Sequence, residues 1–281
     1  MTTAHTVLVI GATGTTGSRT AAQLADAGHR VKAASRRATP LPDTEPVAFD
    51  WHDPATHAAV LDGVDRVYLV PPVGDFDPAA VMLPFLRRAA AGVHRAVLLS
   101  SSAVSEGGPA VGLVHQALPD LFAQWAVLRP SWFMQNFTGA HAHARSIRDE
   151  GAIWTATDSG RVGFVDAEDI AAVAVRALTD EQAPNSDLVL TGPEALSHDD
   201  IAAIVTEVTG RPVAHRRLSY GQLRDRLAAQ VPVEFAGMLA GMDRAIAEGA
   251  EDRVTDTVQR LTGRPPHTFR ALLERETPPG S

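Results

Sequence analysis

The chain has 281 residues, of which 45% are hydrophobic and 21% are charged, and its formal net charge is −8. This composition provides enough apolar material for one large α/β domain, or for such a domain with a smaller lobe. The negative charge argues against nucleic acid and anionic membranes as partners. The absence of cysteine excludes disulfides, thiolate zinc sites and cysteine nucleophiles.

The N-terminal segment Met1–His5 has neither the basic start nor the apolar core of a signal peptide. No later stretch is long enough for a membrane span. We therefore expect a cytoplasmic protein. We also expect it to act on a small-molecule substrate, as a monomer or homodimer.

A short apolar run, Val7–Ile10, leads directly into a glycine-spaced segment, and a long helical pattern follows. A strand, turn and helix in this order place backbone N–H groups and the positive end of a helix dipole where a pyrophosphate can bind. Gly11 permits the tight turn, Gly14 the close approach of the ligand, and Gly17 the packing of helix on strand. The turn predicts a dinucleotide site, with an ordinary βα turn as the alternative. Its predicted cofactor-binding residues are Gly11, Thr13, Gly14, Thr15, Thr16 and Gly17.

Strand and helix patterns alternate along the rest of the first 190 residues. The expected strands are 30–35, 47–49, 66–70, 95–100, 125–128 and 188–190. The expected helices are 54–61, 77–91, 111–123, 131–148 and 167–178. This alternation is typical of parallel βαβ units with helices on both faces, so we predict an α/β fold with a Rossmann-type doubly wound parallel sheet.

From Gly192 onward the pattern is largely helical, with helices expected at 198–209, 219–229, 233–249 and 267–275. We therefore predict an NAD(P)-binding Rossmann domain over 1–191 and a small, mostly helical C-terminal lobe over 192–281, interleaved with 131–165. Ligands of open α/β sheets bind at the carboxyl ends of the strands, so the lobe is expected to cover the substrate.

The end of the second strand favours NADP over NAD. An NAD-selective fold usually places a carboxylate there to bind the ribose 2′-hydroxyl, but this chain has Ser35, Arg36 and Arg37. A guanidinium can bind a phosphate in a bidentate manner, so these residues predict NADP (NADPH) as cofactor. The alternative is that both arginines are solvated loop charges. Asp50, after the third strand, is a candidate for the adenine amino group, with a turn and a helix cap as the alternative.

The proton donor expected of a ketone reductase is missing. Such enzymes in this fold use a tyrosine followed four residues later by a lysine, and neither Tyr68 nor Tyr220 has that lysine. Counted from the serine run 100–102, the tyrosine position falls on His115. We predict His115 as a catalytic proton donor, because histidine can perform this role near neutral pH. The alternative is a helix histidine bonded to a nearby carbonyl.

The glycine turn, the Ser-Arg-Arg segment and the sequence Leu-Arg-Pro-Ser-Trp-Phe-Met-Gln-Asn-Phe at 128–137 resemble the NmrA-like atypical short-chain dehydrogenase/reductases. Four further segments are similar to the ergot-alkaloid reductase subgroup, which includes festuclavine and agroclavine dehydrogenases: 49–51, 67–72, 164–171 and 190–194. The likeness covers nearly the whole chain. It implies an NADPH-bound Rossmann domain whose loops after Val70, Ser100 and Leu128 line the nicotinamide.

The resemblance also implies further site residues. Those expected at the cofactor are Pro71, Pro72, Ser100, Ser101 and Pro130. Those expected at the substrate are Ser102, Trp132, Phe133, Met134 and Phe137, for which the alternative is a helix that packs its apolar side into the core. Asn136 is expected to orient the nicotinamide carboxamide or a substrate oxygen, and is counted with the catalytic residues.

Two polar clusters are expected to be structural. Asp166, Glu168 and Asp169 precede an apolar helical run, where acidic residues cap the helix and favour its dipole. His141 and His143 lack the i, i+4 spacing that places two ligands on one helix face, so no metal site is predicted.

The leading hypothesis is an NADPH-dependent oxidoreductase of secondary metabolism. It would transfer hydride to a C=N, an activated C=C or a quinone-like carbonyl of a small, largely apolar metabolite. The subgroup suggests why the tyrosine and lysine are missing, since a cationic iminium carbon needs no proton after it receives hydride. The alternatives are an NADP-binding redox sensor without turnover, and a redox-neutral isomerase or cyclase that keeps its cofactor.

Overall fold

The computed structural model describes residues 4–277, so the first three residues of the segment examined for a signal peptide lie outside the described range. The chain forms two compact units. Within the described range, unit 1 contains the residues up to Pro130, Ala167–Leu190 and Arg260–Gly263. Unit 2 contains Ser131–Asp166, Thr191–Gln259 and the residues from Arg264 onward.

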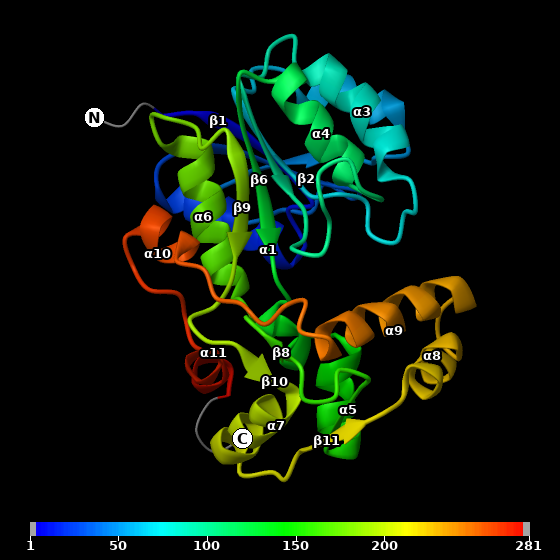
Figure 1. The fold of residues 1–281 in the computed structure, drawn as a ribbon. Helices are drawn as coiled ribbons and strands as arrows, with labels where there is room; N and C mark the ends of the chain where they lie inside the picture. Colours follow the sequence, from blue (N-terminus) through cyan, green and yellow to red (C-terminus); the bar gives the residue numbers. More distant parts are fainter. Residues whose placement is uncertain (1–3, 278–281) are drawn as a thin grey trace. The chain divides into compact units, whose positions relative to one another are not determined.

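Unit 1 is built on a seven-stranded parallel sheet with the order β3-β2-β1-β4-β5-β6-β9 (Figure 1). Every neighbouring pair in it is parallel. The strand order reverses between β1 and β4, which makes this the switch point of a doubly wound sheet. The predicted fold class is therefore confirmed. The strands are β1 Thr6–Ile10, β2 Arg30–Ser35, β3 Glu45–Ala48, β4 Arg66–Leu69, β5 Arg95–Leu99, β6 Gln124–Pro130 and β9 Ser186–Leu190.

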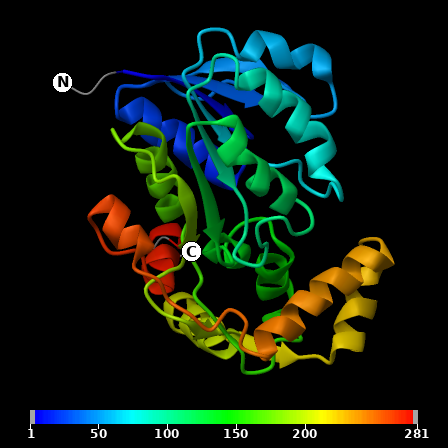
Figure 2. The ribbon, with the colours of Figure 1, turned by 45° about the horizontal axis from the view of Figure 1, so that its top comes forward.

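Helices cover both faces of this sheet (Figure 2). Helix α1 packs against α6 on one face, and α3 packs against α4 on the other. The strands are apolar on both faces for this reason, and Val7, Leu8 and Val9 are fully buried. The helices of unit 1 are η1 Pro54–Thr56, α2 His57–Val60, α3 Pro78–Ala89, α4 Gly112–Leu121, α1 Thr15–Asp26 and α6 Ala167–Thr179; α10, Thr257–Thr262, begins in unit 2 and ends in unit 1.

Unit 2 combines helices with short strands. Strand β7 (Ala152–Thr155) pairs in parallel with β11 (Ala214–Arg217), and β8 (Arg161–Val162) pairs antiparallel with β10 (Leu196–Ser197). These strands were not among the expected elements, because runs of two to four residues are too short to produce a clear periodicity. The helices of unit 2 are η2 Met134–Phe137, α5 Ala142–Glu150, α7 His198–Thr209, α8 Tyr220–Ala228, α9 Val233–Ala247 and α11 Phe269–Glu276.

The predicted helix 131–148 is wrong. Its first residues are extended and pair with the distant Val165: Met134 N donates to Val165 O and Val165 N donates to Trp132 O, each at 3.0 Å. A single 3₁₀ turn, η2, follows, and α5 begins only at Ala142, where His141 Nδ1 accepts a hydrogen bond from His143 N. The apolar pattern of this stretch reflects burial against a partner far along the chain rather than one face of a helix.

A buried carboxylate holds the interior of unit 2 together. Asp166 is fully buried, and its Oδ1 accepts a hydrogen bond from Gln135 Nε2 at 2.7 Å. Its Oδ2 lies 2.8 Å from a guanidinium nitrogen of Arg275 on α11. The sequence prediction of a simple capping charge missed this bridge between η2 and α11, because neither partner is close to Asp166 in sequence.

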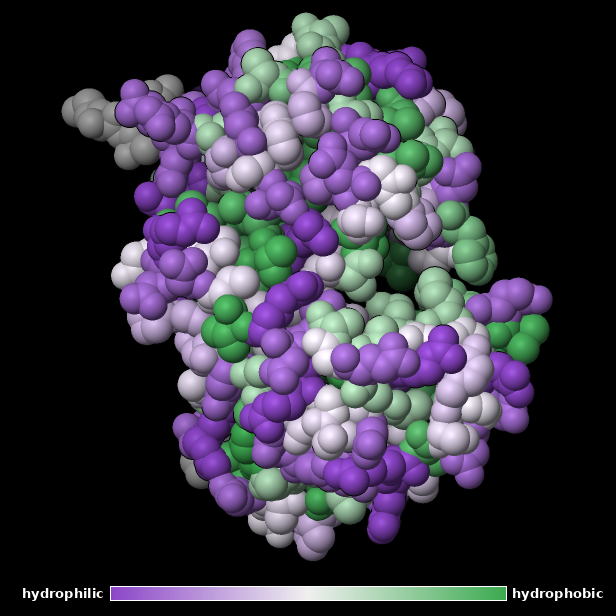
Figure 3. Space-filling view, viewed as in Figure 1, coloured by the Kyte–Doolittle hydropathy of each residue, from purple (hydrophilic) through white to green (hydrophobic). Residues whose placement is uncertain are grey.

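Hydrophilic and hydrophobic residues are interspersed over the face of the molecule shown in Figure 3. Helices that are long and apolar enough to cross a membrane are absent between residues 4 and 277.

The packing of α1 on the first turn generates a stability prediction. A Cβ added at Gly17 would lie 2.1 Å from the carbonyl oxygen of Gly11, a backbone atom that cannot move aside cheaply. We expect Gly17→Ala to lower the free energy of unfolding by about 1–3 kcal/mol, although alanine has the higher helix propensity. Denaturant unfolding measures the change.

Gly92 provides the matched control, because a Cβ there meets nothing within 4 Å and its φ lies outside the left-handed region. Gly92→Ala should leave the unfolding free energy within about 0.5 kcal/mol of wild type. Equal effects of the two substitutions would contradict the packing argument.

Candidate functional site

The parallel sheet of unit 1 gathers the predicted cofactor residues at one edge. Strands β1, β2, β4, β5 and β6 all run in the same direction, so their carboxyl ends lie along the same edge. Ligands of open α/β sheets bind at this edge, next to the switch point. The predicted segments that lie there are 11–17 after β1, 35–37 at the end of β2, 71–72 after β4, 100–102 after β5, and Pro130 at the end of β6.

The glycine turn has the geometry of a phosphate cradle. The amides of Gly11 and Ala12 both donate to Ala34 O at 3.1 Å, which folds the turn onto β2. Gly11 has φ +75°, and a Cβ there would lie 2.9 Å from Val70 Cβ. Gly14 is the N-cap of α1 and has no side chain to occupy the first helical amides. These free amides and the exposed turn residues 13–15 fit a pyrophosphate.

Arg36 and Arg37 are exposed immediately after β2. Ser35 shapes this corner, since its carbonyl accepts hydrogen bonds from Ala38 N and Phe49 N, and its Oγ accepts one from Thr39 N at 3.0 Å. Neither guanidinium has a hydrogen-bond or ion-pair partner among the described residues. Two free cations one strand away from the glycine turn fit a ribose 2′-phosphate.

Asp50 forms a local turn. Its carboxylate accepts a hydrogen bond from His52 N at 3.0 Å, while Asp53 caps η1 through Ala55 N. The neighbouring Trp51 is buried and donates from Nε1 to Val70 O at 3.0 Å. The turn that was kept as the alternative is thus present, and an adenine contact by Asp50 stays a prediction.

His115 lies on α4 and is 3% exposed. Its Nδ1 has no hydrogen-bond partner among the described residues, so the carbonyl bond that was the structural alternative is not formed by this atom. Desolvation lowers the pKa of His115, so its ring is neutral near pH 7. Burial raises the pKa of Tyr68 far above its usual range, so its hydroxyl stays protonated and is a weaker acid than a solvated tyrosine. The catalytic role of His115 stays a prediction.

The three serines at 100–102 differ in the hydrogen bonds that they form. Ser100 N donates to Leu128 O and Ser102 N to Pro130 O, so both residues continue the pairing of β5 with β6. Ser100 Oγ is buried without a hydrogen-bond partner in the described structure. Ser101 Oγ accepts a hydrogen bond from Ala103 N at 3.2 Å. Ser100 therefore retains an unused hydroxyl next to the carboxyl edge of the sheet.

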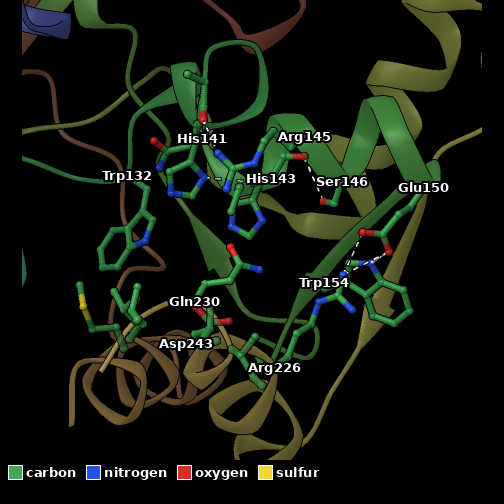
Figure 4. Close-up of a pocket in the computed structure, with 18 of the residues that line it drawn as sticks. Trp132, His141, His143, Arg145, Ser146, Glu150, Trp154, Arg226, Gln230 and Asp243 are labelled. Atoms are coloured by element: carbon green, nitrogen blue, oxygen red, sulfur yellow. Dashed lines mark hydrogen bonds and ion pairs between the residues drawn. The ribbon is translucent and has the colours of Figure 1, made fainter. Parts of the chain in front are cut away.

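Unit 2 contains a cavity of about 540 Å³ (Figure 4). Helices α5, α8 and α9 provide most of its wall, together with β7 and the segment before α5. Aromatic and aliphatic side chains line it together with polar and charged groups. The lining includes Trp132, Asn136, His141, His143, Arg145, Asp149, Glu150, Trp154, Leu223, Arg226, Leu227, Gln230, Val231, Leu239, Met242 and Asp243.

The structure places the predicted site residues of the 131–137 segment in three different settings. Trp132 and Asn136 line the cavity, and the side-chain amide of Asn136 has no hydrogen-bond partner in the described part of the chain. Met134 and Phe137 are 1% and 4% exposed and pack in the hydrophobic core of unit 2. Phe133 is half-buried and forms a backbone bridge with Val165. The substrate roles of Trp132, Phe133, Met134 and Phe137 and the catalytic role of Asn136 stay predictions.

Sequence reasoning missed the polar residues that α5, α8 and α9 bring to the cavity. Arg226 lies 2.9 Å from Glu150, and its guanidinium sits 4.6 Å from the centre of the Trp154 ring. Desolvation lowers the pKa of both His141 and His143, which keeps them neutral near pH 7. No sequence motif marks such residues, because they come from three helices that meet only in the folded chain.

Two family models match the chain. The NAD(P)H-binding model covers residues 11–181, and the NmrA-like family model covers residues 120–264. Among curated proteins, the chain is 46% identical over 265 residues to the uncharacterized oxidoreductase YesF of Bacillus subtilis, covering 94% of this chain and 92% of that one. It is 39% identical over 275 residues to agroclavine dehydrogenase of Claviceps fusiformis, covering 94% of each.

Solved structures show the same fold. An NADPH-dependent quinone oxidoreductase of Escherichia coli complexed with NADPH superposes with a TM-score of 0.82 at 22% identity, covering 96% of this chain and 99% of that chain. The Citrobacter triphenylmethane reductase complexed with NADP(H) has a TM-score of 0.77 at 23% identity, with the same coverage.

The two family matches, the relatives and the cradle after β1 agree. The chain is an NAD(P)H-dependent oxidoreductase, and it belongs to the NmrA-like family.

Proposed function

We propose that the protein is an NADPH-dependent reductase that transfers hydride to a C=N, an activated C=C or a quinone-like carbonyl of a small, largely apolar metabolite. The observation that carries this proposal is the cradle at Gly11–Gly17 with the two unpaired guanidiniums of Arg36 and Arg37 beside it. The names of the relatives support the acceptor classes, since they include a clavine dehydrogenase, a quinone oxidoreductase and a dye reductase.

NADPH, when bound, supplies the hydride and its two electrons. The chain's own residues hold and orient the reactants. The glycine turn holds the pyrophosphate, and Arg36 and Arg37 hold the 2′-phosphate. Asp50 contacts the adenine, and Pro71, Pro72, Ser100, Ser101 and Pro130 border the remainder of the cofactor.

The cavity of unit 2 holds the acceptor in this proposal. Trp132 provides a flat apolar wall, and Asn136 offers a free amide that can orient the acceptor or the nicotinamide carboxamide. A dry, shaped site suffices for hydride transfer to a cationic carbon, because no oxyanion forms. For a quinone-like acceptor, His115 is the proposed proton donor.

The central experiment has two stages. Calorimetric titration with NADPH, NADP⁺, NADH and NAD⁺ comes first, and we expect the phosphorylated pair to bind at least about tenfold more tightly, a difference of about 1.4 kcal/mol. NADPH consumption is then followed with iminium, enone and quinone acceptors. Tight binding with no turnover across these panels would contradict the reductase proposal and favour a sensor or an isomerase.

The phosphate assignment has its own test. We expect the double substitution Arg36→Ala, Arg37→Ala to weaken NADPH binding by about 10- to 100-fold and NADH binding by less than about twofold, because only NADPH carries the 2′-phosphate. Arg30→Ala is the matched control, since Arg30 is an exposed arginine at the opposite end of β2. Equal weakening of both cofactors would contradict the assignment.

A pH profile tests His115. Desolvation lowers the pKa of this residue below 6.5, so its protonated, donating form increases as the pH falls. With a quinone acceptor, we expect kcat of the wild type to rise as the pH falls through that pKa, and His115→Gln to lower kcat by at least about tenfold and flatten the profile. Circular dichroism confirms that the variant folds. An unchanged rate and profile would make His115 a structural residue.

A further inference from the structure

One half-buried carboxylate in the cavity of unit 2 has no counter-ion among the described residues. Asp243 lies on α9, is half-buried, and lines the cavity, where Figure 4 shows it with Gln230 on the side away from His141 and Arg145. Its Oδ2 accepts a hydrogen bond from Ala156 N at 2.8 Å, which ties α9 to the end of β7. Its Oδ1 has no hydrogen-bond or ion-pair partner among the described residues and is accessible to solvent.

The other charged side chains that line the cavity have hydrogen-bond or ion-pair partners or are exposed to solvent. Glu150 is paired with Arg226, and Arg145 donates a hydrogen bond to Ala140 O at 3.0 Å. Asp149 is exposed and therefore solvated. Asp243 is thus the cavity carboxylate that has lost part of its hydration without gaining a cation.

The partial burial of Asp243 without a cation in the described structure destabilises its charged form. Burial raises the pKa of Asp243 to about 6, only partly offset by the hydrogen bond from Ala156 N. The cavity therefore disfavours the bare carboxylate, and a ligand that brings a positive charge to it would restore the lost electrostatic stabilisation. Trp132 lines the same cavity with a ring face on which a cationic or aromatic group can pack.

We propose that Asp243 is a specificity-determining residue that selects acceptors carrying a positive charge, such as a protonated amine, an iminium or a delocalised aromatic cation, over neutral acceptors of the same size. This inference rests on the proposed function, because it assigns the acceptor to the cavity of unit 2. It narrows the three acceptor classes proposed above to the cationic ones.

Binding of a permanently charged probe tests the proposal without turnover. Benzyltrimethylammonium has no group that titrates or accepts hydride, so calorimetry at pH 8 without cofactor reports the cavity alone. We expect Asp243→Asn to weaken its binding by at least about tenfold, because the amide keeps an acceptor for Ala156 N but removes the charge. Glu234→Gln, which removes an exposed charge from the first turn of α9 outside the cavity lining, should change binding by less than about twofold.

The pH dependence gives a second readout. Lowering the pH from 8 to 5 protonates Asp243, so probe binding by the wild type should weaken through about pH 6, while Asp243→Asn should lack this step. Residual change in the variant reports the other groups that face Asp243 or adjoin it. These are His141 just before α5, four charged or titratable residues on α5 (His143, Arg145, Asp149 and Glu150) and Arg226 on α8, together with Arg244 next to Asp243 on α9 and Arg161 on β8, which contacts α9.

Steady-state kinetics links the site to catalysis. With NADPH, Asp243→Asn should raise KM for a cationic triphenylmethane dye by at least about tenfold and leave KM for a neutral naphthoquinone within about twofold. Equal effects on both acceptors, or unchanged probe binding, would overturn the selectivity role. Wild-type probe binding that depends on Asp243, without turnover of any acceptor, would instead overturn the proposed reductase function and leave the cation site in place.

Discussion

The close contact between Gly17 and the carbonyl of Gly11 is the constraint on which the cofactor edge depends. Because position 17 has no Cβ, α1 starts directly against the turn after β1 and presents its first amides at the carboxyl edge of the sheet. The same turn is held to β2 through Ala34 O, so the residues that follow β2 come next to it. The geometry of the turn, which fits a pyrophosphate, thus depends on one packing contact.

Unit 2 is organised by a different kind of contact. The extended segment after β6 pairs with Val165, and the buried carboxylate of Asp166 then bridges Gln135 and Arg275. These bonds hold the segment in a conformation that sends Met134 into the core and leaves Trp132 at the cavity. Backbone pairing therefore decides which residues of the segment 131–137 pack in the core and which line the cavity.

The charge arrangement of the cavity connects its chemistry to its selectivity. The cavity wall combines apolar side chains with neutral histidines, a paired Glu150 and a half-buried Asp243 that has no cation among the described residues. Such a wall costs energy when empty and favours a ligand of complementary charge. The absence of the usual tyrosine and lysine pair is compatible with an acceptor that is already cationic, since its reduction requires no proton.

Local sequence patterns by themselves predicted the Rossmann sheet and the glycine turn, and they showed that no carboxylate follows β2. Strand alternation and turn chemistry act over a few neighbouring residues, so they can be recognised without the folded structure. The helix predicted over 131–148 was wrong, and the short strands of unit 2 were not expected, because both depend on pairing with distant residues such as Val165. Only the tertiary structure decided that α5, α8 and α9 enclose a cavity and that Asp243 faces it unpaired. Burial and the lack of a partner are properties of the folded chain, and no spacing in the sequence encodes them.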